Sequence, residues 1–243
     1  MDEIVWLEGF ISVASVLEAG SRPVEEIVVR AGKWDGRFRW LIHRAEERDI
    51  PWRKLPAEEI DTLAKGKTHG GVLAKVGPRR FLDLPKLIVD VPNPFVVMLD
   101  GVEDPFNFGQ AVRALYAAGA AGLVVRPRNW TSAAAVVARA SAGATERMPM
   151  AVAESAEVAA AYFREQGMLV ACTAKESAVS LYEADLTQAY FLLIGGEKRG
   201  ITRSFLRQAD VRLAVPYGRR FDHSLGTAVS AGVIAFEMMR QRQ

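Results

Sequence analysis

The distribution of apolar residues separates the chain into two regions with different patterns. From residue 95 onward, short continuous apolar runs alternate with amphipathic stretches of helical period. This alternation predicts an α/β fold with a parallel sheet covered by helices on both faces. The predicted strands are 95–99, 122–125, 150–152, 168–172, 191–194 and 211–215, and the predicted helices are 110–118, 132–141, 156–165, 203–208 and 224–240. Residues 95–243, about 150 in number, fit one doubly wound domain.

Residues 1–83 have the mixed pattern of a smaller α/β unit. Strands are predicted at 26–30, around 50–52 and at 71–76, with helices at 38–48 and 57–64. Another helix, which ends near Gly20, is predicted from apolar residues that share one face: Trp6, Phe10, Val13, Ala14 and Leu17. Residues 84–94 contain several prolines and are predicted to be the linker, within which 86–89 could pack as an edge strand.

Two of the predicted strands run into loops that contain glycine. Residues 191–194 continue into Gly195 and Gly196, and the strand 211–215 is followed by Pro216 and then by a charge-free stretch, 225–236. Ligands of open α/β sheets bind outside the carboxyl ends of the strands, so these loops are the expected site. No G-x-G-x-x-G sequence follows the strand 95–99, so a dinucleotide site of the usual kind is not expected.

Composition narrows the class of protein further. Half of the residues are apolar and a quarter are charged, as in ordinary globular proteins. The charge-free stretches are too short to cross a bilayer, and the N-terminus lacks a secretion signal, so a cytoplasmic protein without membrane contact is expected. The single cysteine, Cys172, cannot form an internal disulfide or a cysteine-built metal site, and we expect an inert core residue and no metal.

Positive charge is concentrated in two stretches although the net charge is only +2. Residues 62–82 carry five Lys/Arg and no acid, and residues 198–220 carry seven Lys/Arg and one acid. Such clustering favours a polyanionic partner, although charged loops that only keep the protein in solution remain the alternative. The predicted RNA-binding residues are Lys65, Lys67, His69, Arg79, Arg80, Arg219 and Arg220.

Three motifs in the second region resemble those of the SpoU/TrmH family of RNA ribose 2′-O-methyltransferases. They are Asn107-x-Gly109-x-x-x-Arg113, then Gly195-x-Glu197-x-x-Gly200-Ile201, and then Ser224-Leu225 at the start of a helix of small residues. The family belongs to the knotted SPOUT class. The resemblance therefore implies a trefoil knot made by threading the C-terminal helix, and a homodimer whose site is completed across the interface.

The same resemblance implies methyl transfer from S-adenosylmethionine to a ribose 2′-hydroxyl of RNA, with rRNA favoured over tRNA. The implied cofactor-binding residues are Thr173, Ile194, Gly195, Gly196, Val215, Pro216 and Leu225, and the implied catalytic residues are Asn107, Arg113, Glu197 and Ser224. Arginine has a pKa above about 12, so Arg113 is expected to bind phosphate rather than to remove the hydroxyl proton. Ser224 either contacts the ribose or caps the helix.

The N-terminal region has a family counterpart as well. Glu8-Gly9 before a helix, together with Thr68-His69-Gly70-Gly71 and the strand after it, is similar to the RNA-binding domain of many SpoU members, which has an L30e-like fold. Family members usually have glutamine where Gly70 stands.

The third motif departs from the family pattern at one position. Family members commonly read Ser-Leu-Asn, and this chain has Gly226 after Ser224 and Leu225. Either motif three is rearranged, with Thr227 compensating in part, or catalysis is impaired and the protein is a non-catalytic RNA-binding member of the fold. His223 could then assist the hydroxyl, or be a loop histidine without a role in the reaction.

Overall fold

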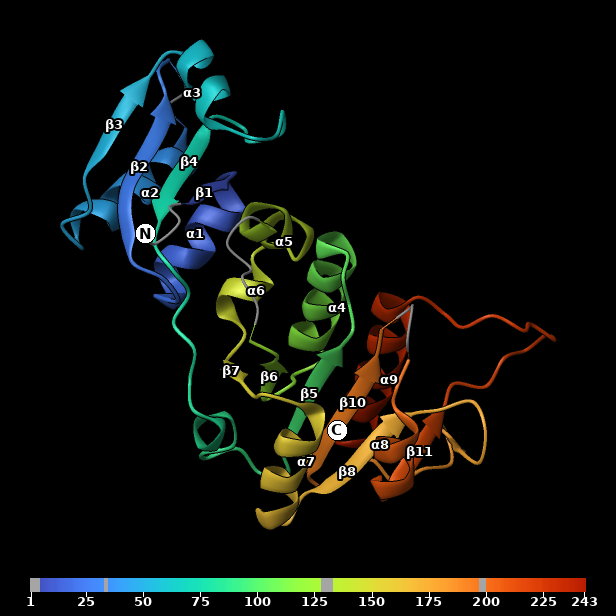
Figure 1. Cartoon of the computed structure of the whole chain (residues 1–243). Helices are drawn as coiled ribbons and strands as arrows, with labels where there is room; N and C mark the ends of the chain where they lie inside the picture. Colours follow the sequence, from blue (N-terminus) through green and yellow to red (C-terminus); the bar gives the residue numbers. More distant parts are fainter. Residues whose placement is uncertain (1–4, 33–34, 128–132, 197–199) are drawn as a thin grey trace. The chain divides into compact units, whose positions relative to one another are not determined.

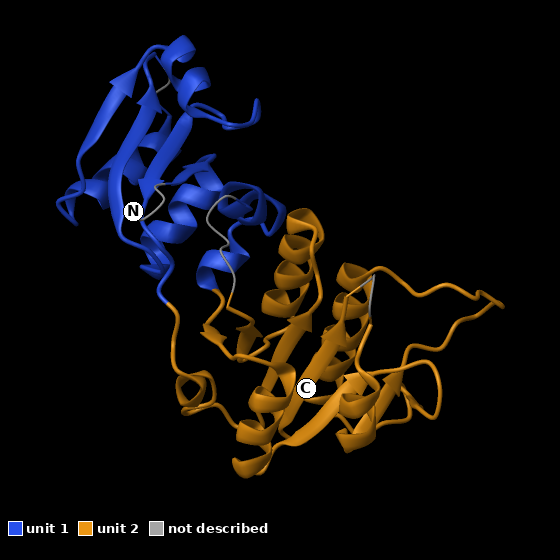
Figure 2. Cartoon of the chain, viewed as in Figure 1, with its two compact units in different colours: residues 1–80, 129–147 blue, residues 81–128, 148–243 orange. Residues whose placement is uncertain are grey.

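The computed structural model describes residues 5–32, 35–127, 133–196 and 200–243 (Figure 1). The chain forms two compact units (Figure 2): unit 1 comprises residues 1–80 and 129–147, and unit 2 comprises 81–128 and 148–243. The chain therefore passes from one unit to the other after Arg80, Arg128 and Arg147. The predicted domain boundaries, 1–83 and 95–243, remain a prediction, from which this packing differs chiefly by placing 129–147 in unit 1.

Unit 1 is built on a four-stranded sheet of order β1-β4-β2-β3. Strand β4 pairs antiparallel with β1 and β2, and β2 pairs parallel with β3. Its elements are β1 (Val5–Glu8), α1 (Phe10–Ala19), β2 (Val24–Arg30), α2 (Gly36–Glu46), β3 (Trp52–Leu55), α3 (Ala57–Leu63), β4 (Val72–Val76), α5 (Ala134–Ala140) and α6 (Ala144–Arg147).

Strand β1 was not predicted, because its Trp6 has helical spacing to the apolar residues of α1. Trp6 pairs with Lys75 of β4 instead, and Gly9, with φ 88°, separates the strand from the helix. Helix α1 ends where predicted, at Gly20 with φ 60°, a left-handed conformation that favours glycine. Helix α5 supplies Ala134 and Ala138 to the apolar core of this unit.

Unit 2 contains a seven-stranded sheet of order β7-β6-β5-β10-β8-β11-β9, and all of its pairings are parallel. The predicted α/β fold with a parallel sheet is thus confirmed. The strands are β5 (Phe95–Asp100), β6 (Gly122–Val125), β7 (Met150–Val152), β8 (Leu169–Thr173), β9 (Val179–Ser180), β10 (Tyr190–Gly195) and β11 (Val211–Ala214), and the helices are η1 (Leu84–Leu87), α4 (Pro105–Ala117), α7 (Ala156–Glu165), α8 (Arg203–Gln208) and α9 (Thr227–Gln241).

Helices pack on this sheet through apolar side chains. Helix α7 stacks Phe163 on Phe191 of β10, with ring centroids 5.1 Å apart. Helices α4 and α9 lie side by side (Figure 1), and α9 also contacts β10. In the described part of the chain, the helices are too short or too polar to cross a membrane.

The predicted linker is partly packed on unit 2. The edge strand expected at 86–89 is wrong, because Leu84–Leu87 form a 3-10 turn with Pro85 at its start. Leu87 is buried against Gly122 of β6, where a Cβ atom would lie 2.8 Å from the Leu87 side chain.

Candidate functional site

A cavity of about 790 Å³ lies at the carboxyl ends of β10, β8 and β11, which are neighbours in the sheet. This is the edge at which parallel α/β sheets bind ligands. The lining residues end these strands, lie in the loops after them, or belong to the first half of α9. They include Thr173, Ile194, Gly195, Gly196, Ile201, Leu213, Val215, Tyr217, Ser224, Leu225, Thr227, Ser230 and Ile234.

The loops after β5 and β10 approach so closely that their glycines are required. The Gly196 amide donates to the Asp100 carbonyl at 2.6 Å. A Cβ atom on Gly196 would lie 2.1 Å from the Gly101 carbonyl oxygen, and one on Gly195 would lie 2.9 Å from Ile201. These glycines therefore expose backbone groups to the cavity where side chains would not fit.

Helix α9 closes the cavity on another side. Thr227 is buried, and its Oγ1 donates to the Gly195 carbonyl at 3.3 Å. Ser230 and Ile234 follow three and seven residues later, so they lie on the same face of the helix as Thr227. The segments that contain the second and third motifs thus meet at this cavity.

The outer wall is formed by the loop 215–226. The Leu225 amide donates to the Tyr217 hydroxyl at 3.1 Å, and Lys175, from the loop after β8, donates to the Asp222 carbonyl at 3.1 Å. The Tyr217 and Phe221 rings lie 6.0 Å apart. The Tyr217 contacts lie within the loop 215–226, and Lys175 joins this loop to the loop after β8.

Most of the predicted cofactor-binding residues line this cavity. Thr173, Ile194, Gly195, Gly196, Val215 and Leu225 all do so, whereas Pro216 is not part of the lining. Of the predicted catalytic residues, Ser224 lines the cavity, and Glu197 lies outside the described residues. Asn107 and Arg113 are on α4 and not on the cavity wall.

Helix α4 begins earlier than predicted, at Pro105 instead of residue 110. Asp104 caps it by accepting a hydrogen bond from the Asn107 amide at 2.7 Å, and proline is compatible with the first helical turn. Asn107 is therefore in the first turn and half-buried. Arg113 is exposed, two turns into the helix, and forms no ion pair with another described residue, so it is a surface arginine and not a buried one.

Ser224 does not cap α9, so that interpretation of its role is wrong. The helix begins at Thr227, its N-cap is Gly226, and the cap makes no side-chain hydrogen bond. Ser224 is exposed in the loop at the mouth of the cavity. His223 is exposed too, and its ring lies 5.4 Å from the Phe221 ring in an edge-on arrangement.

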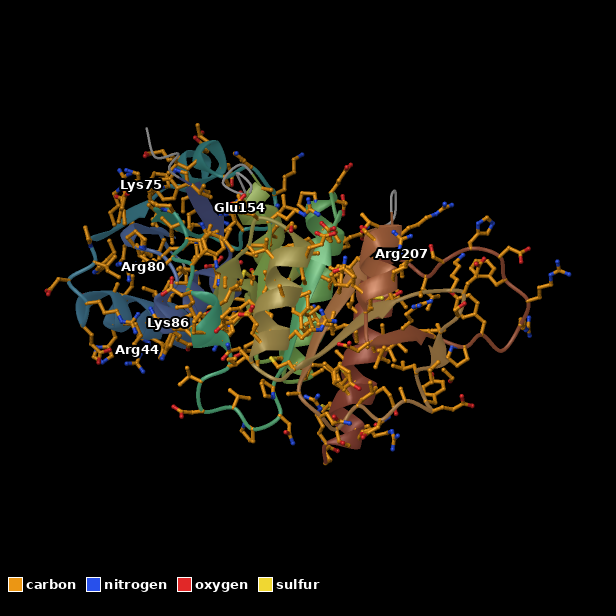
Figure 3. The ribbon with its side chains drawn as sticks, turned by 60° about the horizontal axis from the view of Figure 1, so that its bottom comes forward. Arg44, Lys75, Arg80, Lys86, Glu154 and Arg207 are labelled. Carbon is orange, nitrogen blue, oxygen red and sulfur yellow. The ribbon has the colours of Figure 1, made fainter. Side chains whose placement is uncertain are left out.

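The predicted RNA-binding residues of unit 1 divide into exposed and internal ones. Lys65, Lys67 and Arg80 are exposed (Arg80 is labelled in Figure 3). His69 is buried. Its Nε2 lies 2.9 Å from an Asp61 carboxylate oxygen, and its Nδ1 lies 3.2 Å from the Gly71 amide, which donates to it. Both ring nitrogens are thus engaged within unit 1, which favours a structural role.

Arg79 is also internal, contrary to its predicted place on a surface for RNA. Its guanidinium is 3.4 Å from Glu146, a carboxylate that Arg22 approaches to 3.0 Å. Burial lowers the pKa of Arg79 to about 10, with Glu146 raising it and Arg22 lowering it. The partner that holds Arg79 comes from the distant segment 129–147, which the local charge pattern could not indicate. Arg219 and Arg220, by contrast, are exposed at the cavity mouth.

Several site residues were not found from the sequence. Ser230 belongs to a run of small residues typical of a helix core, and only the position of α9 brings it to the cavity. Thr227 was considered only as a partial replacement for an asparagine at position 226. Tyr217 directly follows Pro216, so an aromatic residue after a strand end was an available signal. Arg126 after β6 pairs with Asp100 at 2.7 Å at the same sheet edge. The described residues contain no cluster suited to a metal ion.

Comparison with protein families gives two matches that together span most of the chain. Residues 94–236 match the SpoU rRNA methylase family, and residues 6–82 match the RNA 2′-O ribose methyltransferase substrate-binding family. The chain belongs to the SpoU rRNA methylase family. The resemblance proposed from the three motifs and from the N-terminal region is thereby confirmed.

Individual relatives can be aligned with this chain over nearly their full length. The 23S rRNA (guanosine-2′-O-)-methyltransferase RlmB of Escherichia coli K12 is 29% identical over 245 residues, covering 100% of both chains. The enzyme of the same name from Photorhabdus laumondii is 31% identical, covering 100% of this chain and 99% of its own. The crystal structure of the SpoU methyltransferase AviRb from Streptomyces viridochromogenes, in complex with AdoMet, has a TM-score of 0.82 at 21% identity, over 99% of this chain and 91% of that one.

Proposed function

We propose that this protein transfers a methyl group from S-adenosylmethionine to the ribose 2′-hydroxyl of a guanosine in 23S rRNA. The observation that carries the proposal is the cavity at the carboxyl ends of β10, β8 and β11, formed by loops of two family motifs. Full-length relatives named 23S rRNA (guanosine-2′-O-)-methyltransferase support the substrate. The proposed substrate, ribosomal RNA, also supports a cytoplasmic location.

The residues of the cavity fit S-adenosylmethionine. A flat adenine ring suits apolar walls such as Ile194, Leu213 and Ile234, and ribose hydroxyls suit the backbone groups that Gly195 and Gly196 expose. Thr173, Val215 and Leu225 complete the proposed contacts. When bound, the cofactor supplies a methyl group that is already activated by a sulfonium.

The protein's own contribution is to bind and orient the ribose in line with that methyl group and to exclude water. Arg113 is exposed and positively charged, so we propose that it binds the phosphate beside the target nucleotide. Asn107, Glu197 and Ser224 are the proposed contacts around the ribose. We do not assign Arg113 as the base that removes the 2′-hydroxyl proton, because its guanidinium stays protonated at neutral pH.

Gly226 does not favour the alternative of a non-catalytic RNA-binding member. Its backbone, with φ −58° and ψ 148°, starts α9 in an ordinary N-cap conformation. Thr227 and Ser224 beside it line the cavity, which is therefore formed without the asparagine side chain.

We further propose that unit 1 and the loop 215–226 bind the RNA. Of the predicted RNA-binding residues of unit 1, Lys65, Lys67 and Arg80 are exposed, and Arg219 and Arg220 add positive charge at the mouth of the cavity. Phosphate contacts of this kind position RNA without reading its sequence. The choice of nucleotide then depends on contacts near the cavity.

A homodimer and a trefoil knot threaded by α9 are parts of the same proposal. Helices α4 and α9 pack together and expose large apolar side chains: Phe106 (53% exposed), Val229 (54%) and Phe236 (44%). Val229 and Phe236 are seven residues apart and share one face of α9. Such a surface suits a second copy of the chain.

The activity is tested by incubating the protein with S-adenosylmethionine labelled in the methyl group and with 23S rRNA. We expect label on a guanosine ribose, and none when the 2′-hydroxyl is already methylated. Arg113→Ala should lower kcat/KM by about 10- to 100-fold, the loss typical of a charged hydrogen bond. Arg207→Ala, at an exposed arginine of α8 (Figure 3), is the matched control. Absence of ribose methylation on any cellular RNA would contradict the proposal.

The dimer is tested by light scattering after gel filtration. Val229→Glu combined with Phe236→Glu should produce monomers at concentrations where the unaltered protein is dimeric, because two charges from each protomer would be buried in the interface. Val158→Glu is the control, at a residue of α7 that is 53% exposed. A dimer that tolerates the double change would place the interface elsewhere.

A further inference from the structure

We infer that Thr227 is a positioning residue of the cofactor cavity, and that its hydroxyl fixes the backbone carbonyl at the end of β10. The inference rests on the proposed binding of S-adenosylmethionine in this cavity. Gly226, the residue before it, has no side chain and makes no capping hydrogen bond. Thr227 therefore carries the first side chain of α9 at the cavity.

The hydrogen bond of Thr227 joins two elements that are distant in the sequence. Its Oγ1 lies 3.3 Å from the oxygen of Gly195, and only 3% of the residue is exposed. Gly195 is the last residue of β10 and pairs with Asp100 of β5. The hydroxyl thus links the start of α9 to the strand ends that form the cavity floor.

This contact leaves the hydroxyl with a defined chemical role. A threonine hydroxyl has one hydrogen to donate and two lone pairs with which to accept. Because the hydrogen points to Gly195, a ligand in the cavity meets Thr227 only as an acceptor. The ligand group that suits it is an N–H donor, such as the exocyclic amine or the ammonium group of S-adenosylmethionine.

Helix α9 is also held in place by packing contacts that do not involve Thr227. The helix packs along α4, where a Cβ atom on Gly232 would contact Ala114 at 3.5 Å. Loss of one hydroxyl should therefore leave the helix in place and change mainly the cavity. A purely structural residue would instead affect unfolding as strongly as it affects ligand affinity.

Three variants of the full-length protein separate these roles. Thr227→Val keeps the shape but removes the hydroxyl, Thr227→Ser keeps the hydroxyl, and Ser230→Ala removes a neighbouring hydroxyl on the same face. We expect Thr227→Val to weaken the binding of S-adenosylmethionine and S-adenosylhomocysteine about tenfold in calorimetry, equivalent to about 1.4 kcal/mol. The KM for the cofactor should rise by a similar factor and kcat should change less. Thr227→Ser should behave like the unaltered protein, and Ser230→Ala should lose less affinity than Thr227→Val.

A fourth variant asks whether a side chain at position 226 can replace the hydroxyl. The backbone of Gly226 is in a region open to any residue. Adding Gly226→Asn to Thr227→Val should restore part of the lost affinity, because an amide can donate to the same carbonyl. Failure of Thr227→Ser to retain affinity would overturn the inference.

Amide hydrogen exchange supplies a measurement that needs no cofactor. Without the hydroxyl, exchange at Gly196 and in the first turn of α9 should accelerate, whereas α7 should be unchanged. If affinity and exchange both stay as in the unaltered protein, the inference is wrong. If exchange accelerates in Thr227→Val but the unaltered protein binds no S-adenosylmethionine, the positioning role stands and the proposed function fails.

Discussion

Glu8 and Arg139, 131 residues apart in the sequence, form an ion pair of 2.6 Å inside unit 1. The Glu8 side chain is fully buried, and its other oxygen accepts hydrogen bonds from the amides of Lys65 and Gly66. One carboxylate therefore holds both the loop that carries the predicted RNA-binding lysines and a helix from the middle of the methylase sequence. The fold of unit 1 therefore depends on residues outside 6–82, the range that matches the substrate-binding family.

Arg139→Met should destabilise unit 1 by about 3–5 kcal/mol, because removing one partner leaves the buried Glu8 carboxylate without its counter-charge. All five tryptophans of the chain fall in the residue ranges of unit 1, so their fluorescence during urea unfolding measures this loss. Arg147→Met is the control. Its ion pair with Glu18 is about 40% exposed, and such pairs contribute about 0–1 kcal/mol. Equal losses in both variants would contradict the role of Glu8.

Glu146 should make unit 1 sensitive to acid. Burial raises its pKa, but the charges of Arg22 and Arg79 and the hydrogen bonds from Ser21 and Arg22 outweigh burial, so the pKa lies below its ordinary value of 4.5. A carboxyl whose pKa is lower in the folded state contributes stability that is present above about 4.5 and is lost as the pH falls through the folded value.

Glu146→Gln tests this dependence. The difference in free energy of unfolding between the unaltered protein and the variant should be largest near neutral pH and should shrink below about 4.5. Glu59→Gln, at an exposed residue of α3, should show a much smaller difference at every pH. A difference for Glu146→Gln that does not change with pH would show that the carboxylate is not paired as described.

Cys172 should be unreactive in the folded protein. Burial raises the pKa of its thiol to about 11, an effect that Arg212 partly offsets, and the residue is fully buried in β8. Because the thiolate is the reactive form, a thiol reagent near neutral pH should modify it only after local or global unfolding of unit 2. Labelling rates in increasing urea measure this directly. Fast labelling without denaturant would mean that β8 is accessible.

Gly196→Ala should weaken cofactor binding. The new Cβ atom would meet the Gly101 backbone at 2.1 Å, and a backbone neighbour cannot rotate away, so the loops after β5 and β10 must separate. Overpacking of this kind costs about 1–3 kcal/mol, which corresponds to a loss of affinity between about fivefold and 150-fold. Calorimetry with S-adenosylhomocysteine measures it. Gly218→Ala, where no heavy atom lies within 4 Å, should bind normally.

The fold of unit 2 was readily predicted because its strands are continuous apolar runs. The predicted bounds of α7 and α8 agree with the structure, and the strands agree to within one or two residues. Strand β9 has only two residues and α6 only four, too few for a periodic pattern. Periodicity also could not indicate that 129–147 packs with unit 1, because a pattern identifies an apolar face but not its partner.

The sequence predicts those parts of the candidate site that a short local pattern marks, such as glycine at the end of an apolar strand. Gly195 and Gly196 directly follow a strand, and such positions can be identified along the chain. His69 and Arg79 were predicted from local positive charge, but their contacts with Asp61 and Glu146 give them internal partners. Thr227 was considered only as a partial replacement for the asparagine missing at position 226, and its contact with Gly195 follows from the geometry of α9.

The chain crosses between the two units three times, and this restricts which chimeras with its relatives can fold. A chimera that exchanges only residues 1–80 would join a foreign sheet to the native α5 and α6, and would lose the partners of Arg139 and Glu146 unless the donor supplied equivalents. Grafting unit 1 onto another scaffold therefore requires two separate stretches of sequence, 1–80 and 129–147, to be transplanted together.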